Sequence, residues 1–145
     1  MNKPAPDTRT AYSHFLPITT RWMDNDVYGH VNNVVYYSYF DTVVNGYLVR
    51  EGALELKAGR IIGLVAETHC SYFASLAFPD RIDAGLRVTR LGNTSVRYEV
   101  GIFSEGAEQP AAQGYFVHVY VDRDTRRPVA LPDELVAALK PLLIP

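Results

Sequence analysis

Residues 24–50 read DNDVYGHVNNVVYYSYFDTVVNGYLVR, a polar loop that leads directly into an apolar segment. Large apolar side chains recur over residues 33–50 at the spacing of one helix face, which predicts a helix there. Asn32 or Asn33 is suited to the N-cap position, and Arg50 followed by a glycine is a typical stop. Most other positions are apolar too, so we expect a helix that is buried on nearly all sides. The apolar stripe consists of Tyr36, Phe40, Val43, Val44 and Tyr47.

The segments on either side of this helix have the period of two that is typical of β-strands. One segment precedes the helix, at residues 15–23, and Pro17 near its start favours an edge position or a β-bulge. Four segments follow, and we expect consecutive hairpins to join them into an antiparallel meander. The four are residues 61–73, 81–91, 95–103 and 113–121, the last apolar on both faces as in the centre of a sheet; a terminal helix is expected at 132–143.

The composition of the chain is that of an ordinary globular domain, with 48% hydrophobic and 21% charged residues among 145. The net charge of −2 provides no basic field for nucleic acid or an anionic membrane surface. Cys70 is the one cysteine and has no partner for an intramolecular disulfide, which favours a reduced, cytoplasmic setting. We expect a flexible polar tail over residues 1–12, without the apolar core of a secretory signal, and a single domain over residues 13–145.

A strand, a buried helix and four further strands predict an α+β architecture in which a sheet packs on a helix. A sheet of this size can wrap the helix. Such a sheet leaves one broad edge or face exposed, and we expect a partner to cover it.

The loop before the helix combines groups that suit acyl chemistry. Asp24 and Asp26 supply carboxylates, Gly29 permits a tight turn, and His30 titrates near neutral pH. Free N–H groups at a helix start can polarise a carbonyl, and a nearby carboxylate can attack that carbonyl or deprotonate water. The loop therefore predicts acyl-group hydrolysis, and the chain contains neither zinc-ligand spacing nor a G-x-S-x-G motif.

The pattern D-x-D-x-x-G-H-V-N-N at residues 24–33, followed by a tyrosine-rich helix, resembles the hotdog-fold thioesterases of the 4-hydroxybenzoyl-CoA thioesterase family. Residues 71–73, 79–82 and 90–96 also match strands and turns of that family, so the resemblance extends over about residues 15–122. It implies an antiparallel sheet wrapped around one long central helix. It also implies an acyl-CoA thioesterase that hydrolyses an acyl or aryl-acyl thioester to the free acid and CoA, without a cofactor or metal.

The resemblance assigns the catalytic carboxylate to Asp26 and the carbonyl-polarising backbone N–H to Asn33. His30 is a further catalytic candidate, either as a proton shuttle or as a residue that fixes the turn. We expect a structural turn role for Asp24. Plant acyl-ACP thioesterases are similar over the same stretch, but they have an asparagine where this chain has Tyr28, so that asparagine's role does not transfer.

Four further residues are candidates for substrate binding. Tyr28 and Gly29 are expected to shape the pocket, and Gly63 to line it. One branch of the family binds the CoA phosphate with a basic triplet, which is replaced here by residues 92–94, Gly-Asn-Thr. Arg90, or alternatively Arg87, is a possible substitute for that contact.

The resemblance also implies edge-to-edge pairing, with active sites between subunits, and hence a homodimer or homotetramer. Asp41 and Asn45, on the polar side of the helix, either face the pocket or form hydrogen bonds across that interface. Alternatives to an acyl-CoA thioesterase are an acyl-ACP thioesterase, a hotdog dehydratase or hydratase, and a non-catalytic acyl-thioester-binding module. The sequence leaves open the acyl chain preference and whether Asp26 acts as base or nucleophile.

Overall fold

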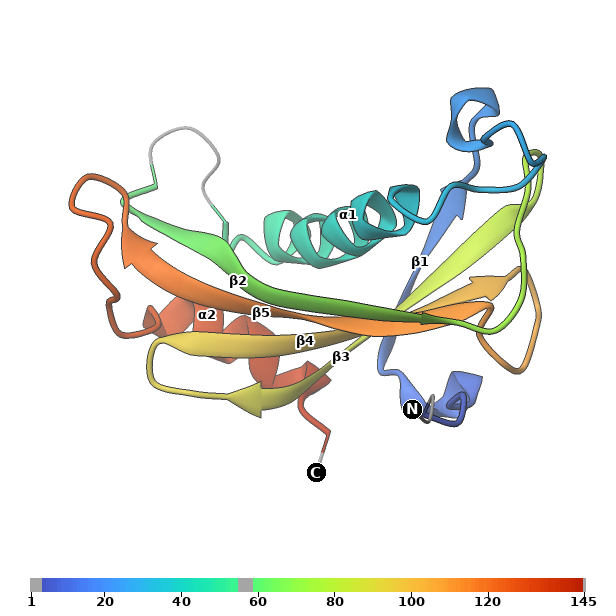
Figure 1. Cartoon of the computed structure of the whole chain (residues 1–145). Coiled ribbons are helices and arrows are strands. Elements are labelled where there is room, and N and C mark those ends of the chain that lie inside the picture. Colours follow the sequence, from blue (N-terminus) through green and yellow to red (C-terminus); the bar gives the residue numbers. More distant parts are fainter. Residues whose placement is uncertain (1–3, 55–58, 145) are drawn as a thin grey trace.

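The sheet of this protein is built from long antiparallel strands, and one of its faces is covered by a helix (Figure 1). The structure is a computed structural model that describes residues 4–54 and 59–144. Three short 3-10 turns accompany the longer elements, at Arg9–Ala11, Trp22–Asp24 and Lys140–Leu142. The longer elements are β1 (His14–Thr19), α1 (Val35–Arg50), β2 (Ile61–Tyr72), β3 (Arg81–Leu91), β4 (Ser95–Ser104), β5 (Ala112–Asp122) and α2 (Asp133–Leu139).

The five strands form one sheet in the order β1-β3-β4-β5-β2, and every neighbouring pair is antiparallel. This order corrects the expected four-strand meander, because β2 pairs with β5 and not with β3. The reason lies in the connection after β2, where the N–H groups of Phe73 and Ala74 both donate to the Ala111 carbonyl. The chain is thereby held beside β5. Residues 73–80 then connect β2, at one edge of the sheet, to β3, which lies next to the opposite edge strand. The remaining three strands, β3, β4 and β5, do form the expected meander.

Helix α1 lies along one face of the curved sheet, and its predicted apolar stripe supplies much of the core. Phe40, Val43 and Val44 are fully buried. The expectation of a helix buried on nearly all sides is wrong for the single chain, because Asp41, Thr42 and Val49 are exposed. The structure thus shows a helix of 16 residues packed on the sheet. The expected long helix at the centre of a wrapped sheet is not clearly seen.

The start of α1 differs from the expected cap. Val34 occupies the N-cap position, and no side chain caps it. The Asn32 side chain instead accepts a hydrogen bond from the Val34 N–H, at 3.0 Å, one turn before the helix. Asn32 is held in the loop because its own N–H donates to the Asp24 carbonyl.

The two ends of the chain depart modestly from the expected elements. Strand β1 ends at Thr19, where a strand was expected to continue to residue 23, and a 3-10 turn follows. Of the two alternatives for Pro17, the edge position is confirmed, since within the described residues β1 pairs with β3 alone. The terminal helix divides into α2 and a 3-10 turn, because Pro141 provides no N–H to continue it.

Strand β2 is the opposite edge of the sheet, and in the described chain only β5 pairs with it. Residues 64–69 are exposed along this edge, including Leu64 and Val65, which are 39% and 51% exposed. Exposed apolar side chains beside unpaired backbone groups are typical of an edge that another strand covers. None of the described helices has the length and apolar character needed to cross a membrane.

Candidate active site

A buried carboxylate fixes the loop before α1. Asp24 is 1% exposed and accepts hydrogen bonds from the Arg21 backbone N–H, at 2.9 Å, and from the Tyr39 hydroxyl, at 2.8 Å. The Arg21 guanidinium forms an ion pair with the same carboxylate at 3.1 Å. Because Arg21 follows β1 and Tyr39 lies in α1, Asp24 connects the segment after β1 to the helix.

The second carboxylate, that of Asp26, is half-buried and is oriented by two donors. Its Oδ1 accepts from the Tyr28 N–H at 2.9 Å, and its Oδ2 accepts from the Asn32 side-chain amide at 3.3 Å. The Asp26 N–H in turn donates to the His30 carbonyl at 3.0 Å, which closes the loop. The carboxylate is therefore held in one orientation without a counter-ion among the described residues.

A tight turn separates Asp26 from His30. Gly29 adopts φ +84°, a conformation that side chains disfavour, and its N–H donates to the Asp26 carbonyl. The rings of Tyr28 and His30 are stacked, with centroids 6.5 Å apart, and Tyr28 is 80% exposed. The turn places His30 on the same side of the loop as Asp26.

The helix start supplies a free donor. In the described part of the chain, the Asn33 N–H has no hydrogen-bond acceptor, whereas its carbonyl accepts from the Tyr72 hydroxyl at 3.1 Å. Tyr72 lies at the end of β2, so this contact fixes the start of α1 against the sheet edge. A backbone N–H without an acceptor near a helix start is suited to bind a carbonyl oxygen or an anion.

These groups line one cavity of about 220 Å³. Asp26, His30 and Asn33, the three candidates for catalysis, all border it. Its other walls are Val31, Tyr36, Tyr72, Ala74 and Ser75. A neighbouring hollow of about 430 Å³ is lined by Trp22, Asn25, Asp26, Val27 and Gly29, so Asp26 lies between the two.

Two of the candidate substrate-binding residues lie elsewhere in the single chain. Gly63 is near the opposite end of β2, beside Tyr120 and His118, and a Cβ at this position would lie 2.9 Å from the Tyr120 ring. Arg90 lines a separate hollow on the other face of the sheet, together with Glu67 and Arg97. Within one chain, the structure therefore brings Tyr28 and Gly29 to Asp26, but neither Gly63 nor Arg90.

Sequence reasoning missed several residues of this site. The sequence indicates Asn32 as a helix cap, yet its amide orients Asp26. Tyr36 has the spacing of a core residue and Tyr72 falls in a segment that matches the family, yet both line the cavity beside Asp26. The tyrosines flank the helix start and the end of β2, and the separation of 39 residues between Asn33 and Tyr72 hides their contact in the sequence.

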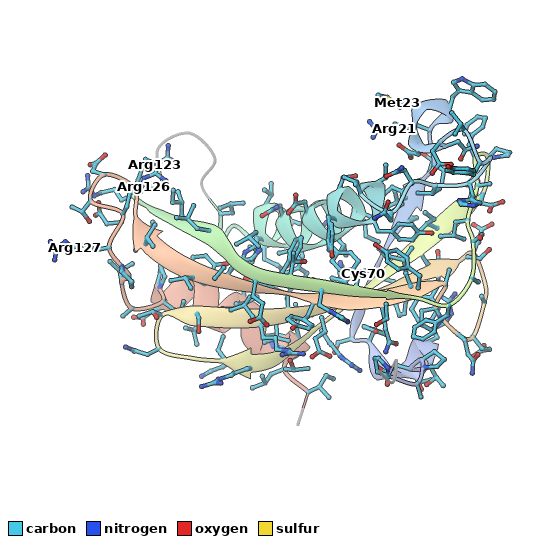
Figure 2. The ribbon with its side chains drawn as sticks, in the orientation of Figure 1. Arg21, Met23, Cys70, Arg123, Arg126 and Arg127 are labelled. Atoms are coloured by element: carbon cyan, nitrogen blue, oxygen red, sulfur yellow. The ribbon has the colours of Figure 1, made fainter. Side chains whose placement is uncertain are left out.

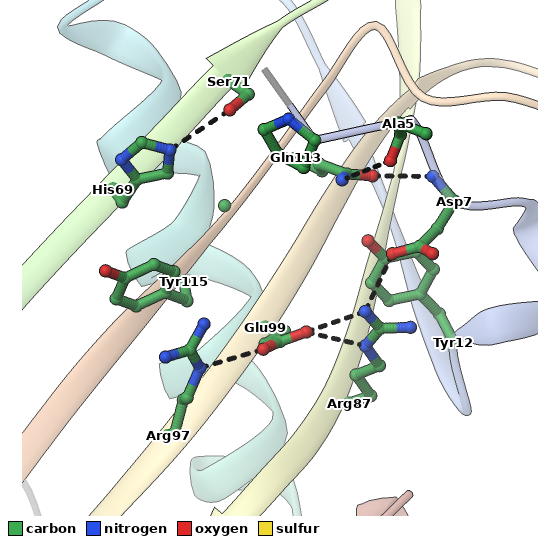
Figure 3. Close-up of a pocket in the computed structure, with 12 residues that line it drawn as sticks. Ala5, Asp7, Tyr12, His69, Ser71, Arg87, Arg97, Glu99, Gln113 and Tyr115 are labelled. Carbon is green, nitrogen blue, oxygen red and sulfur yellow. Dashed lines mark hydrogen bonds and ion pairs between the residues drawn. The ribbon is translucent and has the colours of Figure 1, made fainter. Parts of the chain in front are cut away.

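A further hollow, lined by several charged residues, lies on the other face of the sheet and differs in character (Figure 3). Its volume is about 410 Å³, and its charged groups pair with one another. Glu99 accepts hydrogen bonds from Arg87 at 2.7 Å and from Arg97 at 2.9 Å, and Arg87 also binds Asp7 at 2.8 Å. Burial alone would raise the pKa of Glu99, but the two guanidinium groups outweigh it and hold the pKa below its usual range. We interpret this cluster as the attachment of residues 5–12 to the sheet.

Other chemistry finds little support among the described residues. No group of three or more histidine, cysteine, aspartate or glutamate side chains is placed there to hold a metal ion. Burial raises the pKa of the Cys70 thiol to about 11, which disfavours its thiolate as a nucleophile.

An antiparallel sheet in the order β1-β3-β4-β5-β2, with α1 on one face and a carboxylate loop at the helix start, defines a hotdog-type thioesterase fold. The model of the thioesterase-like superfamily matches residues 20–139, and the chain belongs to this family. The match covers the loop, the helix and the sheet from near the end of β1 onward.

Three relatives illustrate the range of similarity. The crystal structure of the PA5185 protein of Pseudomonas aeruginosa PAO1 is 55% identical, covers 96% of this chain and 97% of that chain, and has a TM-score of 0.94. The 1,4-dihydroxy-2-naphthoyl-CoA thioesterase Slr0204 of Synechocystis shares the fold, with 19% identity, coverage of 86% and 93%, and a TM-score of 0.79. The YsmA protein of Bacillus subtilis is 24% identical over 135 residues, 92% of this chain and 90% of that protein.

Proposed function

We propose that this protein is an acyl-CoA thioesterase that hydrolyses an acyl or aryl-acyl thioester to the carboxylic acid and free CoA. The observation that carries the proposal is the shared cavity of Asp26 and the Asn33 N–H. One group is an oriented carboxylate and the other is a free donor at a helix start. A thioester carbonyl needs both, a nucleophile or base on one side and a donor for the developing oxyanion on the other.

The chemistry follows from these two positions. The thioester oxygen accepts a hydrogen bond from the Asn33 N–H, which stabilises the negative charge that develops when the carbonyl is attacked. In one route, Asp26 removes a proton from water and the hydroxide adds to the carbonyl carbon. In the other, the Asp26 carboxylate adds directly and water then cleaves the resulting anhydride. Both routes break the C–S bond, and the CoA thiolate leaves and is protonated.

The remaining candidates have supporting roles. His30 borders the same cavity, so it can exchange a proton with the leaving thiolate or hold the turn. Tyr28 and Gly29 shape the entrance through the turn that they form with Asp26. Gly63 and Arg90 reach an Asp26 site only from a second copy of the chain.

We therefore also propose that two copies pair through β2. The family resemblance implies edge-to-edge pairing, and the exposed Leu64 and Val65 on the free edge of β2 support it. In such a dimer the β2 residues of one copy complete the cavity beside Asp26 of the other.

The test is hydrolysis of a panel of acyl-CoA thioesters, with detection of the free thiol. Asp26→Asn keeps the size of the side chain and removes its charge, so we expect a loss of at least about a hundredfold in rate on the best substrate. Near-normal turnover by this variant would refute the assignment. Matched acyl-ACP substrates in the same panel distinguish the two carriers, and hydration of an enoyl thioester would instead indicate a hydratase.

A further inference from the structure

A cluster of arginines lies at the end of the sheet opposite Asp26 (Figures 1 and 2). Arg123, Arg126 and Arg127 belong to the turn that follows β5. Arg60 directly precedes β2 and is joined to this turn, because its carbonyl accepts from the Arg123 N–H. We call these four residues the arginine turn; they are concentrated in a chain whose net charge is −2.

Local acidic groups neutralise only part of this cluster. Asp122 and Asp124 both pair with Arg60, at 3.3 and 3.5 Å. The second Asp122 oxygen is occupied by two backbone N–H groups of the turn, those of Asp124 and Thr125. Arg126 and Arg127 are exposed, and neither has an acidic partner among the described residues. Two guanidinium groups are thus free to bind an anion.

The backbone holds the two free arginines on a closed turn. The Arg126 N–H donates to the Asp122 carbonyl, and the Asp122 N–H donates to the Arg127 carbonyl. Arg126 adopts φ +63°, the left-handed conformation that such a turn requires of one residue. The two guanidinium groups therefore extend from neighbouring positions of one ordered turn.

Pairing of two β2 strands relates the arginine turn to the catalytic cavity. The exposed stretch 64–69 is centred between Ala66 and Glu67. Antiparallel pairing about this point, as a two-fold dimer requires, places the first residues of one β2 beside the last residues of the other. Tyr72, at the end of β2, lines the Asp26 cavity, and Arg60 lies at the start of β2. The arginine turn of one copy is then next to the Asp26 cavity of the other.

Charge complementarity favours the same arrangement. Asp26, which has no cationic partner among the described residues, lies in the loop between β1 and α1, and the arginine turn lies at the other end of the sheet, between β5 and α2 (Figure 1). Antiparallel pairing brings opposite charges together at both ends of the interface, whereas a parallel arrangement would bring like charges together.

We propose that the arginine turn of a second copy binds the phosphate groups of the CoA substrate, with Arg126 and Arg127 as the main contacts. Guanidinium groups bind phosphate oxygens through paired hydrogen bonds, and the nucleotide end of CoA carries several such oxygens. The site is distinct from residues 92–94, where the basic triplet of related enzymes is replaced by Gly-Asn-Thr. The inference rests on the proposed function for its ligand, and on the β2 dimer for its location.

The first test measures binding, independently of catalysis. Arg126→Gln/Arg127→Gln removes two charges and leaves an uncharged, shorter polar side chain at each exposed position. Calorimetric titration with free CoA and with pantetheine, which lacks the nucleotide phosphates, separates the two ends of the ligand. We expect the double variant to weaken CoA binding by about tenfold or more, and pantetheine binding by less than twofold.

A matched control changes the net charge by the same amount at a different place. Lys140→Glu also removes two units of positive charge, from an exposed residue at the end of α2. We expect CoA affinity within twofold of the wild type for this variant. An equal loss in both variants, or no loss in the arginine variant, would overturn the proposal, and thermal unfolding verifies that both variants fold.

The second test determines whether the arginines act across the interface. A mixed dimer is prepared from one Asp26→Asn chain and one Arg126→Gln/Arg127→Gln chain, each with its own affinity tag. If the turn acts across the interface, one of the two sites has an intact Asp26 and an intact arginine turn. We expect about half of the wild-type kcat/KM for the acyl-CoA substrate. Activity no higher than that of the arginine variant would exclude the trans arrangement.

Failure of the proposed thioesterase function can be distinguished from failure of the proposed CoA-binding role of the arginine turn. If the wild-type protein hydrolyses no acyl thioester, the thioesterase assignment is wrong, but CoA binding and its dependence on Arg126 and Arg127 still decide the present proposal. If acyl-ACP turnover depends on the two arginines and CoA binding does not, the turn recognises a carrier protein and the proposal is wrong.

Discussion

The side-chain amide of Asn32 donates to Oδ2 of Asp26 at 3.3 Å, while its carbonyl oxygen accepts from the Val34 N–H at 3.0 Å. One side chain thus connects the carboxylate to the segment that starts α1. Asn33, whose N–H is the proposed donor to the thioester oxygen, lies directly between Asn32 and Val34 in the sequence. The relative position of carboxylate and donor therefore depends on Asn32.

We predict that Asn32→Ala lowers kcat by roughly tenfold to a hundredfold, because Asp26 loses the contact that orients it. KM should change by less than threefold, since the cavity walls remain. The double variant Asn32→Ala/Asp26→Asn should be no slower than Asp26→Asn alone, because Asn32 acts through Asp26. Additive losses in this cycle would contradict a positioning role.

Asp24 is predicted to act on stability. Asp24→Ala leaves the Tyr39 hydroxyl and the Arg21 N–H without their acceptor, and we expect a loss of about 2–4 kcal/mol in the free energy of unfolding. Tyr39→Phe removes one donor to the charged group and should cost about 1.5–3 kcal/mol. Urea unfolding measures both. A cost below about 0.5 kcal/mol for Asp24→Ala would show that the buried carboxylate does not hold the loop.

Much of the fold is visible in the sequence where local pattern decides it. The bounds of β3 agree with the expected residues 81–91, and the end of α1 at Arg50 agrees as well. Pro17 marks an edge strand because it lacks an N–H for a second neighbour. Each of these features depends on residues a few positions apart.

The pairing of β2 with β5 could not be predicted in the same way. Eight residues separate β2 from β3, and such a connection is compatible with a hairpin or with a crossing to another part of the sheet. The same limit applies to the site, where Tyr72 meets Asn33 only after the sheet has formed. The loop motif indicates the chemistry at Asp26, but the walls of the cavity come from tertiary structure.

His118 provides a prediction for the pH dependence of stability. It is 5% exposed on the inner face of β5, its Nε2 has no hydrogen-bond partner in the described chain, and burial lowers its pKa from 6.5 to about 4. Unfolded His118 therefore binds a proton between these two pH values, while the folded form does not. The unfolded state gains protons as the pH falls, so stability decreases from pH 7 to pH 4 by about 3 kcal/mol through this residue.

The measurement compares wild type with His118→Phe, a ring of similar size that does not titrate. Urea unfolding at pH 7 and pH 4 should show a decrease that is about 3 kcal/mol smaller in the variant. Other titrating groups, such as Glu99, contribute equally to both proteins. Parallel pH profiles would show that His118 is not responsible.

The free edge of β2 provides the last prediction. Leu64→Lys/Val65→Lys places two charges in the exposed stretch of β2, so a two-fold dimer would have to bury four of them in one interface. We expect the wild type to have at least twice the 16.2 kDa chain mass in light scattering, and the variant to be a monomer. The variant should also lose most of its thioesterase activity, because the second copy contributes to each cavity. Leu143→Lys, at a side chain that is 42% exposed away from this edge, is the matched control and should keep the wild-type mass. A monomeric wild type with full activity would place the whole site within one chain, and would remove the basis for a partner's contribution to catalysis.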